Sequence, residues 1–346
     1  MLIVRPVTFA DLAGLERLAV ISGGSMTTLP ANRDHIGELI NRTQQSLRKT
    51  VEMPGEESYH FVLVDSENGE ILGVSGIDAT VGITTPFYSY RIDEVVHASS
   101  DLQIHNRVPA LHLCQDYTGA ARLCTLFLDQ QARNTENLQL VSRARMMFIA
   151  QQPKRFASRI ISELQGIADE NHQSPFWESL GRHFFSMDFN KANYLTGINS
   201  KGFIADLMPH YPVYVPMLSK AAKEALGKTR PDQQPVLDLL ENEGFRFRNY
   251  VDIFDAGPTL ESRTDDIRSV RASNCKPIRV TEQPSETDSN SPNGTLNKTS
   301  MLISNLHLNE FRCLLAEVDP DHPELSPAQA QQLQLSDGDE AQLLLL

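Results

Sequence analysis

The sequence is short of the cysteine patterns that build zinc sites and disulfide frameworks. Its four cysteines, Cys114, Cys124, Cys275 and Cys313, lie far apart and none falls into a close pair. Zinc-binding and disulfide-rich proteins place their cysteines in closely spaced pairs or regular sets. We therefore expect neither a metal site nor a disulfide framework.

Positive charge is also scarce. The chain has 31 Lys and Arg residues against 44 Asp and Glu residues, which gives a formal net charge of -13. Nucleic-acid-binding proteins usually carry a basic surface, so nucleic acid is not an expected partner. The acidity fits either a cationic substrate or simple solubility. No apolar run has signal-peptide form or is long enough to span a membrane, so we expect a cytoplasmic protein without a membrane partner.

What the sequence does contain is a strand, a turn and a helix in succession at residues 120–152. The uncharged run 123–128 is typical of a buried strand. Helical spacing follows, with apolar Leu138, Val141, Met147 and Ile149. Because the first N–H groups of a helix point outward at such a junction, the stretch predicts a place where an anion binds.

This junction resembles that of the acyl-CoA N-acyltransferase superfamily, in which an Arg-x-x-Gly-x-Gly pattern holds the pyrophosphate of CoA. Arg133 stands at the start of the pattern, but Glu136 and Leu138 stand where the two glycines would be. A glutamate at a helix start stabilises the helix dipole and repels a phosphate placed there. The resemblance implies a CoA thioester as co-substrate, held by altered phosphate contacts.

The order of elements is similar to the same superfamily and implies an α+β fold, a mixed sheet flanked by helices. Thr8 and Asp11 form a capping pattern for the first helix, and an Asn-Gly turn joins the runs 60–64 and 71–77 into a hairpin. We expect an acyltransferase-like domain at 1–280 with an insertion at 80–118, a flexible loop at 281–300 and a small C-terminal β-barrel-like region at 301–346. The elements expected are strands at 2–4, 94–97, 101–105, 160–167, 245–254, 301–303 and 311–318, and helices at 8–21, 34–51, 174–181, 218–226 and 235–243.

A series of short segments then narrows the resemblance to one family. The segments are 28–32 (TLPAN), 96–99 (VHAS), 123–129 (LCTLFLD), 174–177 (SPFW), 186–189 (SMDF) and 245–260 (FRFRNYVDIFDAGPTL). In this order they resemble the arginine N-succinyltransferases of bacterial arginine catabolism. The resemblance implies transfer of a succinyl group from succinyl-CoA to the α-amine of L-arginine, with L-ornithine as the other acceptor, and attack by the amine without a nucleophilic Cys or Ser.

The resemblance also implies site residues. The family's contact with succinyl-CoA falls on Leu126, through the main chain of a strand whose N–H polarises the thioester carbonyl. The family's proton-donor histidine falls on Arg230, and an arginine does not donate a proton near neutral pH because its pKa lies above about 12. Arg230 would instead stabilise the outgoing thiolate or bind a carboxylate, which leaves His210 or water as the acid.

Other polar residues have two readings each. Asp252, Asp255 and Asp188 suit a guanidinium, since its forked donors prefer carboxylates, but the first two also suit a turn before Gly257. His97 and His105 would either line an arginine pocket or pack a hairpin, and Trp177 is expected in the core. A basic group would contact CoA phosphates or form a solvated helix face: Arg133, Arg143, Arg145, Lys154, Arg155 and Arg159.

Two functions of different kinds follow. The first is a working arginine N-succinyltransferase. The second is a subunit that keeps the fold, has little or no activity and assembles with a catalytic paralogue, because members of this family can occur as paired, related subunits. Glu136, Leu138 and Arg230 favour the second, and the intact strand at 123–128 and the segment 245–260 favour the first. Either way we expect a homo- or hetero-oligomer. Another N-acyltransferase with a different CoA ester is a third possibility.

Overall fold

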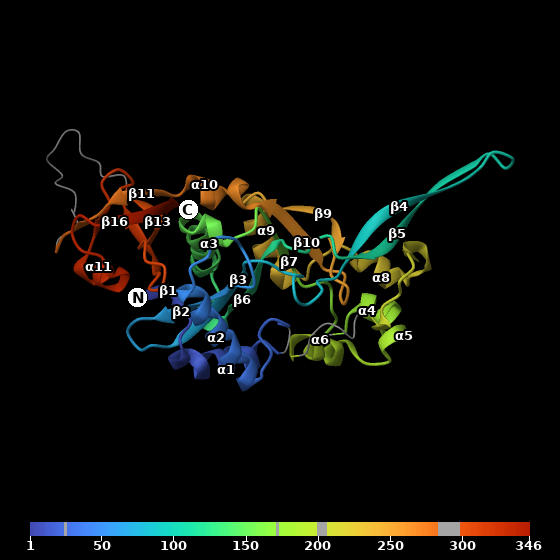
Figure 1. Ribbon diagram of the computed structural model, residues 1–346, viewed down its shortest axis with the longest axis horizontal. Coiled ribbons are helices and arrows are strands. Elements are labelled where there is room, and N and C mark those ends of the chain that lie inside the picture. The colour runs from blue at the N-terminus through green and yellow to red at the C-terminus, as the bar shows by residue number, and fades with distance from the viewer. Residues whose placement is uncertain (24–25, 171–172, 199–205, 283–297) are drawn as a thin grey trace.

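The computed structural model describes residues 1–23, 26–170, 173–198, 206–282 and 298–346. Within these residues a mixed sheet of fourteen strands runs the length of the molecule in the order β11-β16-β13-β14-β1-β2-β3-β6-β7-β10-β9-β4-β5-β8, and β12 pairs separately with β15 (Figure 1). The strands are β1 Leu2–Pro6, β2 Ser58–Asp65, β3 Ile71–Asp78, β4 Ser89–Ser99, β5 Ile104–Cys114, β6 Ala121–Leu128, β7 Arg159–Glu163, β8 Val213–Tyr214, β9 Arg246–Val251, β10 Pro258–Arg263, β11 Asn274–Pro277, β12 Arg279–Val280, β13 Thr299–Ser304, β14 Cys313–Val318, β15 Glu324–Leu325 and β16 Glu340–Leu345.

Helices cover both faces of this sheet, which confirms the expected α+β class. Asn32 caps α2 by accepting a hydrogen bond from the N–H of His35, and Asn134 caps α3 in the same way from Asn137. The Asp11 carboxylate accepts from the N–H of Thr8, which confirms the predicted capping pattern. The helices are α1 Leu12–Ile21, α2 Arg33–Arg48, α3 Thr135–Gln151, α4 Pro175–Ser179, α5 Gly181–Phe185, α6 Phe189–Ile198, α8 Lys220–Ala225, α9 Gln234–Asn242, α10 Arg268–Ala272 and α11 Pro327–Leu333. None of the helices in the described ranges is long and apolar enough to cross a membrane.

Two cores lie on opposite faces of the central strands. On one face the ring of Phe148, from α3, lies 5.2 Å from that of Phe61 and 5.3 Å from that of Phe311. On the other face the side chains of α1 and α2 pack against Val62 and Val74. Consecutive residues of a strand point to opposite faces, so β2 contributes to both cores. Trp177 is buried in a third cluster beside β9, as expected.

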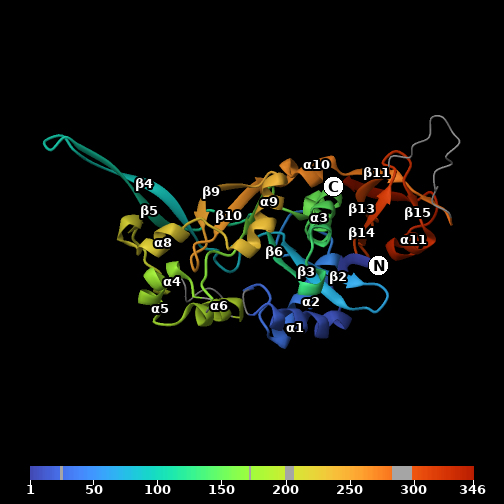
Figure 2. The same ribbon diagram turned by 180° about the vertical axis from the view of Figure 1, so that it is seen from behind.

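The strands within the expected insertion are longer and more regular than the sequence indicated. The strands expected at 94–97 and 101–105 are the far half of one hairpin, β4 and β5, which pair from Ser89↔Cys114 to Ser99↔Ile104. The base of this hairpin pairs with β9 and β8, and its outer part projects from one end of the molecule (Figures 1 and 2). The expected strand at 160–167 is also shorter than predicted, because β7 ends at Glu163 where the chain leaves the sheet.

The C-terminal strands extend the opposite edge of the same sheet. Strand β14 pairs with β1 at Cys313↔Val4, and β13, β16 and β11 follow outward. The strands that the sequence placed in a small β-barrel-like region therefore continue the main sheet through β1. Most of the loop expected at 281–300 lies outside the described residues.

Candidate active site

The central strand β6 is paired on both sides only at its start. Along one side it runs antiparallel to β3, and along the other it pairs parallel with β7 at Ala121↔Ile160, Arg122↔Ile161 and Leu123↔Ser162 only. Strand β7 pairs with β10 on its other side along its whole length and ends at Glu163, so it does not follow β6 beyond Leu123. The edge of β6 from Cys124 to Leu128 is thus open toward β7, so β6 is an inner strand that is partly unpaired.

A β-bulge lies at the point where the two strands part. Gly76 of β3 faces Cys124 and Val74 faces Phe127, so Thr125 and Leu126 together lie opposite the single residue Ser75. Thr125 has φ +53°, a left-handed conformation that is unusual for a β-branched residue and therefore strained. The bulge turns the backbone of Thr125 and Leu126 out of the regular ladder, toward the open edge.

Arg145 of α3 lies beneath the bulge. Its Nη1 donates to the carbonyl oxygens of Gly76 and Cys124, 3.2 Å from each, and Nη2 donates to Ser142 Oγ at 3.0 Å. The side chain is buried, and no carboxylate is among these partners. Burial lowers the pKa of Arg145 to about 10, which still leaves the guanidinium charged at neutral pH. A positive charge therefore lies under the strand where the bulge opens.

Two cavities meet at this strand. The first, which we call the splay cleft, has a volume of about 350 Å³ and lies between the parting ends of β6 and β7. The second, the α2 cavity, has a volume of about 650 Å³ and lies between α2, β2 and the 79–87 segment. Both are lined by Thr27, Thr28, Arg122, Cys124 and Thr125, so the bulge forms part of the wall between them.

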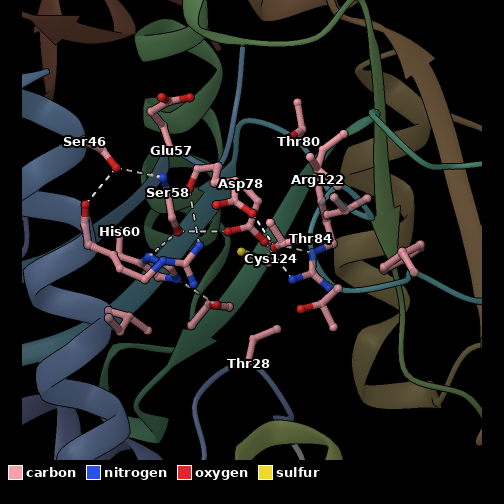
Figure 3. A pocket seen from close by; sticks show the side chains of 18 of the residues that line it. Thr28, Ser46, Glu57, Ser58, His60, Asp78, Thr80, Thr84, Arg122 and Cys124 are labelled. Carbon is pink, nitrogen blue, oxygen red and sulfur yellow. Dashed lines mark hydrogen bonds and ion pairs between the residues drawn. The ribbon is translucent and has the colours of Figure 1, made fainter. Parts of the chain in front are cut away.

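The α2 cavity is rich in charge (Figure 3). Arg122 donates to Asp78 Oδ2 at 2.7 Å, and Lys49 pairs with the buried carboxylate of Glu57. Burial alone would raise the pKa of Asp78, but the Arg122 guanidinium, His60 and the Ser58 hydroxyl together outweigh it and hold that pKa below its ordinary value. Asp78 is therefore an anion at neutral pH, in a cavity large enough for an amino acid.

His60 of β2 lies in the wall of the α2 cavity and contacts the bulge. Its Nε2 is 3.2 Å from Thr125 Oγ1, and its Nδ1 is 3.4 Å from Ser58 Oγ, which itself donates to Asp78 Oδ1 at 2.9 Å (Figure 3). Burial lowers the pKa of His60 to about 4, so the imidazole is neutral. The neighbouring Cys124 thiol is held protonated because burial raises its pKa to about 12. A protonated thiol is a poor nucleophile, which fits a reaction without a cysteinyl intermediate.

Comparison with known proteins decides the family. Residues 2–269 match the family described as the arginine N-succinyltransferase beta subunit, and residues 292–344 match its C-terminal domain. The chain belongs to the arginine N-succinyltransferase beta subunit family. The chain is 41% identical to the arginine N-succinyltransferases of Yersinia pseudotuberculosis and Salmonella paratyphi B, over 100% of this chain and 98% of each relative. The solved arginine/ornithine succinyltransferase subunit AI of Pseudomonas aeruginosa has a TM-score of 0.90 with this chain and 37% identity, over 100% of this chain and 98% of that one.

In this member of the arginine N-succinyltransferase family, six of the candidate site residues singled out in the sequence line the splay cleft. They are Leu126, Arg133, Arg145, Arg230, Asp252 and Asp255. Leu126 lies within the bulge, and Arg133 lies over the ring of Phe127 at 5.9 Å. Outside both cavities lie His210, which is exposed, and Asp188, which pairs with Arg182 at 3.3 Å.

The two aspartates of the cleft bind the backbone. Asp252 Oδ1 accepts from the N–H of Phe254 at 2.7 Å, and Asp255 accepts from the N–H groups of Gly166 and Gly257, both at 2.8 Å. Burial and the neighbouring Asp252 raise the pKa of Asp255 above its ordinary value. Both carboxylates therefore stabilise the turn before Gly257, which is the second of the two roles that the sequence allowed for them.

Arg230 is tied to a carboxylate of its own turn. Its Nε and Nη2 donate to the two oxygens of Asp232, at 2.9 and 2.6 Å. The pair faces the cleft with its charge largely balanced, so less of the positive charge of Arg230 is available to a ligand.

Most of the other basic residues named in the sequence analysis neither line the splay cleft, where CoA phosphates would bind, nor form a solvated helix face. Arg143 is buried and donates to Glu243 Oε1 at 2.8 Å, and Arg155 is buried and donates to Tyr59 Oη at 3.0 Å. Arg159 pairs with Glu261 at 2.5 Å, and Lys154 is exposed. Only Arg133 and Arg145 of that group line the splay cleft. The pair His97 and His105 is exposed on the projecting hairpin, outside both cavities.

Glu136 and Leu138 lie at the start of α3 and line neither cavity. The cap of that helix is already occupied, because Asn134 accepts the N–H of Asn137 at 2.8 Å. Sequence reasoning missed His60, Thr125, Asp78 and Arg122. A lone histidine in the apolar run 58–64 was the one available signal, and nothing local marked the bulge.

Proposed function

We propose that this chain transfers a succinyl group from succinyl-CoA to the α-amine of L-arginine. The observation that carries the proposal is that two cavities meet at a bulge on a partly unpaired strand. One cavity gives access to the open strand edge, and the other holds charged groups suited to an amino acid. Membership of the family supports an acyl-CoA co-substrate and arginine as acceptor.

The splay cleft suits the thioester. An extended pantetheine arm would pair with the open edge of β6, as an added strand does, and this would bring its carbonyl to the bulge at Leu126. A backbone N–H there and the charge of Arg145 beneath would stabilise the oxygen as it becomes negative. Arg133, at the mouth of the strand, supplies positive charge for the succinyl carboxylate or a CoA phosphate.

The α2 cavity suits the acceptor. A guanidinium prefers carboxylates that meet its planar fork, and Glu38, Glu56 and Glu57 line this cavity. Arg42, also on its wall, suits the α-carboxylate. The shared wall at Thr125 would then bring the α-amine next to the thioester carbonyl, so that attack needs no covalent enzyme intermediate.

Arg230 occupies the position at which the resemblance places a proton-donor histidine for the outgoing thiolate. Arg230 would stabilise it by charge, although pairing with Asp232 weakens that effect. This pairing, together with Glu136 and Leu138, is the observation that favours the second candidate function, a subunit of low activity that assembles with a catalytic paralogue.

Thiol release separates the two functions. The purified chain is mixed with succinyl-CoA and L-arginine, and free CoA is followed with a thiol reagent, with acetyl-CoA and L-ornithine as comparison substrates. Turnover at about 1 s⁻¹ or faster by the chain alone supports the enzyme. Thiol release that requires a co-purified paralogue would establish the assembly role instead.

We also propose that the chain works as an oligomer with a second copy or a related subunit. Beyond Arg91 of β4 and Ala110 of β5, the projecting hairpin pairs with no third strand among the described residues. A two-stranded ribbon is marginally stable alone, and this one exposes Val96, Leu102 and Ile104. The solved Pseudomonas aeruginosa relative is itself described as a subunit.

Light scattering on a sizing column tests this arrangement. The double variant Val96→Lys and Ile104→Lys should lose the oligomer while keeping the melting temperature of the body. The proposal would be contradicted if the parent were monomeric both alone and with its paralogue, or if the double variant kept the oligomer.

We also propose that the chain works in the cytoplasm, which suits a CoA thioester substrate and four cysteines without disulfides.

A further inference from the structure

The hydrogen bonds around His60 assign its tautomer. Asp78 is ionised, so the single hydroxyl proton of Ser58 goes to Asp78 Oδ1 at 2.9 Å. The Ser58 oxygen then faces His60 Nδ1 at 3.4 Å as an acceptor. Thr43 Oγ1 lies 3.5 Å from the same nitrogen and already accepts from the backbone N–H of His60 at 3.1 Å. With two acceptor oxygens beside Nδ1, we assign the imidazole proton to that nitrogen. Nε2 of the neutral imidazole is therefore unprotonated, and the Thr125 hydroxyl donates to it over 3.2 Å.

The oxygen of Thr125 is consequently available to accept a proton. Its own hydrogen points to His60, and Thr125 lines both the splay cleft and the α2 cavity. An amine that enters from the α2 cavity to attack a thioester at the bulge passes this oxygen. Ser58, His60 and Thr125 thus form a chain of hydrogen bonds that runs from the anion Asp78 to the junction of the two cavities. Its first part, from Asp78 through Ser58 to His60, is seen in Figure 3.

We propose that His60, acting through the Thr125 hydroxyl, takes up the proton that the attacking amine loses and returns it to the departing sulfur. This inference rests on the proposed acyl transfer. His60 does not itself contact the substrate, and Thr125 is the group that does.

The proton and electron balance closes without another reactant. The lone pair of the neutral amine forms the C–N bond, and the C=O π electrons move to oxygen. The nitrogen, now positively charged and acidic, gives a proton to Thr125 Oγ while the Thr125 proton moves to His60 Nε2. When the oxyanion collapses, the C–S bond breaks with its electron pair on sulfur, and the same path returns the proton to give the thiol.

The surroundings suit a base that is neutral at rest. Burial lowers the pKa of His60 to about 4, which is too low to deprotonate an ordinary ammonium but suits the far more acidic nitrogen of the tetrahedral adduct. The charged and titratable groups that face it are Asp78 of β3, Arg122 of β6, and His35 and Arg42 of α2. Asp78 is the anion among them and stabilises the transient imidazolium through Ser58. The path also supplies the acid that Arg230 cannot be.

The test is a cycle of variants in the thiol-release assay. Glutamine at position 60 places an acceptor near Thr125 but takes no proton, so His60→Gln should lower kcat by on the order of 100-fold with little change in KM for succinyl-CoA. Thr125→Val should lose a similar factor, and Thr125→Ser, which keeps the hydroxyl, should retain most of the rate. The double variant with Gln and Val should be no slower than either single one, because both changes break one path.

The pH dependence separates proton transfer from packing. Hydroxide can replace a missing base, so the deficit of His60→Gln should shrink as the pH rises from about 7 to about 9. The relay would be overturned if the kcat of His60→Gln were within about threefold of that of an active parent. It would also be overturned if the double variant lost kcat by the product of the two single losses, or if the loss of kcat in His60→Gln were the same at every pH. A parent without activity, alone or with its paralogue, would instead refute the acyl transfer itself, and the relay with it.

Discussion

Replacing Arg145 by methionine tests whether the buried charge acts on the reaction or only supports the fold. The change keeps an unbranched apolar side chain of similar length in α3 and removes the guanidinium. Two carbonyl oxygens, those of Gly76 and Cys124, lose their Nη1 donor. The splay cleft loses the charge beneath the bulge.

The expected magnitudes differ for stability and for rate. Each buried carbonyl left without its donor costs about 1–3 kcal/mol. Removal of a buried charge that has no carboxylate partner returns several kcal/mol of desolvation, so the two terms largely cancel. We expect the free energy of unfolding to change by less than about 2 kcal/mol. For the reaction nothing offsets the loss, and removal of a group that stabilises an oxyanion lowers kcat about 100- to 1,000-fold.

Arg143 offers a matched control two residues away in the same helix. It is also a buried arginine, but it pairs with the fully buried Glu243 and lines neither cavity. Arg143→Met leaves that carboxylate short of its main partner, so we expect a loss of about 3 kcal/mol of stability and a nearly normal kcat. Urea unfolding and steady-state kinetics on both variants give the two numbers. A kcat within threefold of the parent for Arg145→Met, or equal kcat losses in both variants, would refute a role for its charge.

Three further substitutions probe the same strand and its neighbours. A side chain at Gly76 would place its Cβ 2.6 Å from His60 Nε2 and 3.0 Å from Cys124 Sγ, so Gly76→Ala should displace the imidazole and lower kcat about tenfold or more, whereas Gly37→Ala, at an open position, should not. Because burial lowers the pKa of His60 from 6.5 to about 4, the folded state binds fewer protons than the unfolded state in that window. The parent should therefore lose about 3 kcal/mol more stability than His60→Gln as the pH falls from 7 to 4, and equal losses in urea titrations would show that the histidine is not desolvated. Arg230→His should leave turnover unchanged or raise it, since the arginine is already paired with Asp232, and a collapse of kcat would show that the guanidinium binds substrate.

Local signals in the sequence were enough to predict the elements that depend on neighbouring residues. The capping pair Thr8 and Asp11, the Asn-Gly turn before β3 and the uncharged run of β6 each act within a few residues, and the structure contains all three. The projecting hairpin was seen only in fragments. A ribbon that is solvated on both faces lacks the alternation of apolar and polar residues that marks a half-buried strand, and pairs such as Arg107 with Glu94 form across the strands.

The site was harder to predict because it depends on contacts between strands. The bulge at Thr125 requires that Gly76 have no side chain and that His60 approach from β2, and no pattern within β6 reports either condition. For the arginines of α3 the sequence suggested more exposure than the structure shows. Charged residues in a helix usually mark its exposed face, but α3 is enclosed, so Arg143 and Arg145 are buried.

Two side chains with different proposed roles approach β6 from opposite faces of the sheet. Arg145 reaches the bulge from α3 on one face, where its positive charge would stabilise the proposed oxyanion, and His60 reaches Thr125 from the face that α2 covers. A nearby positive charge makes an imidazole harder to protonate, and Arg122 and Arg42 already face His60 from its own cavity. Arg145 lies on the other face of the strand and does not add to that effect. The left-handed Thr125 joins the two contacts, because its hydroxyl meets His60 and the carbonyl of the preceding Cys124 accepts from Arg145. This gives a physical reason for a strained backbone at the centre of the fold.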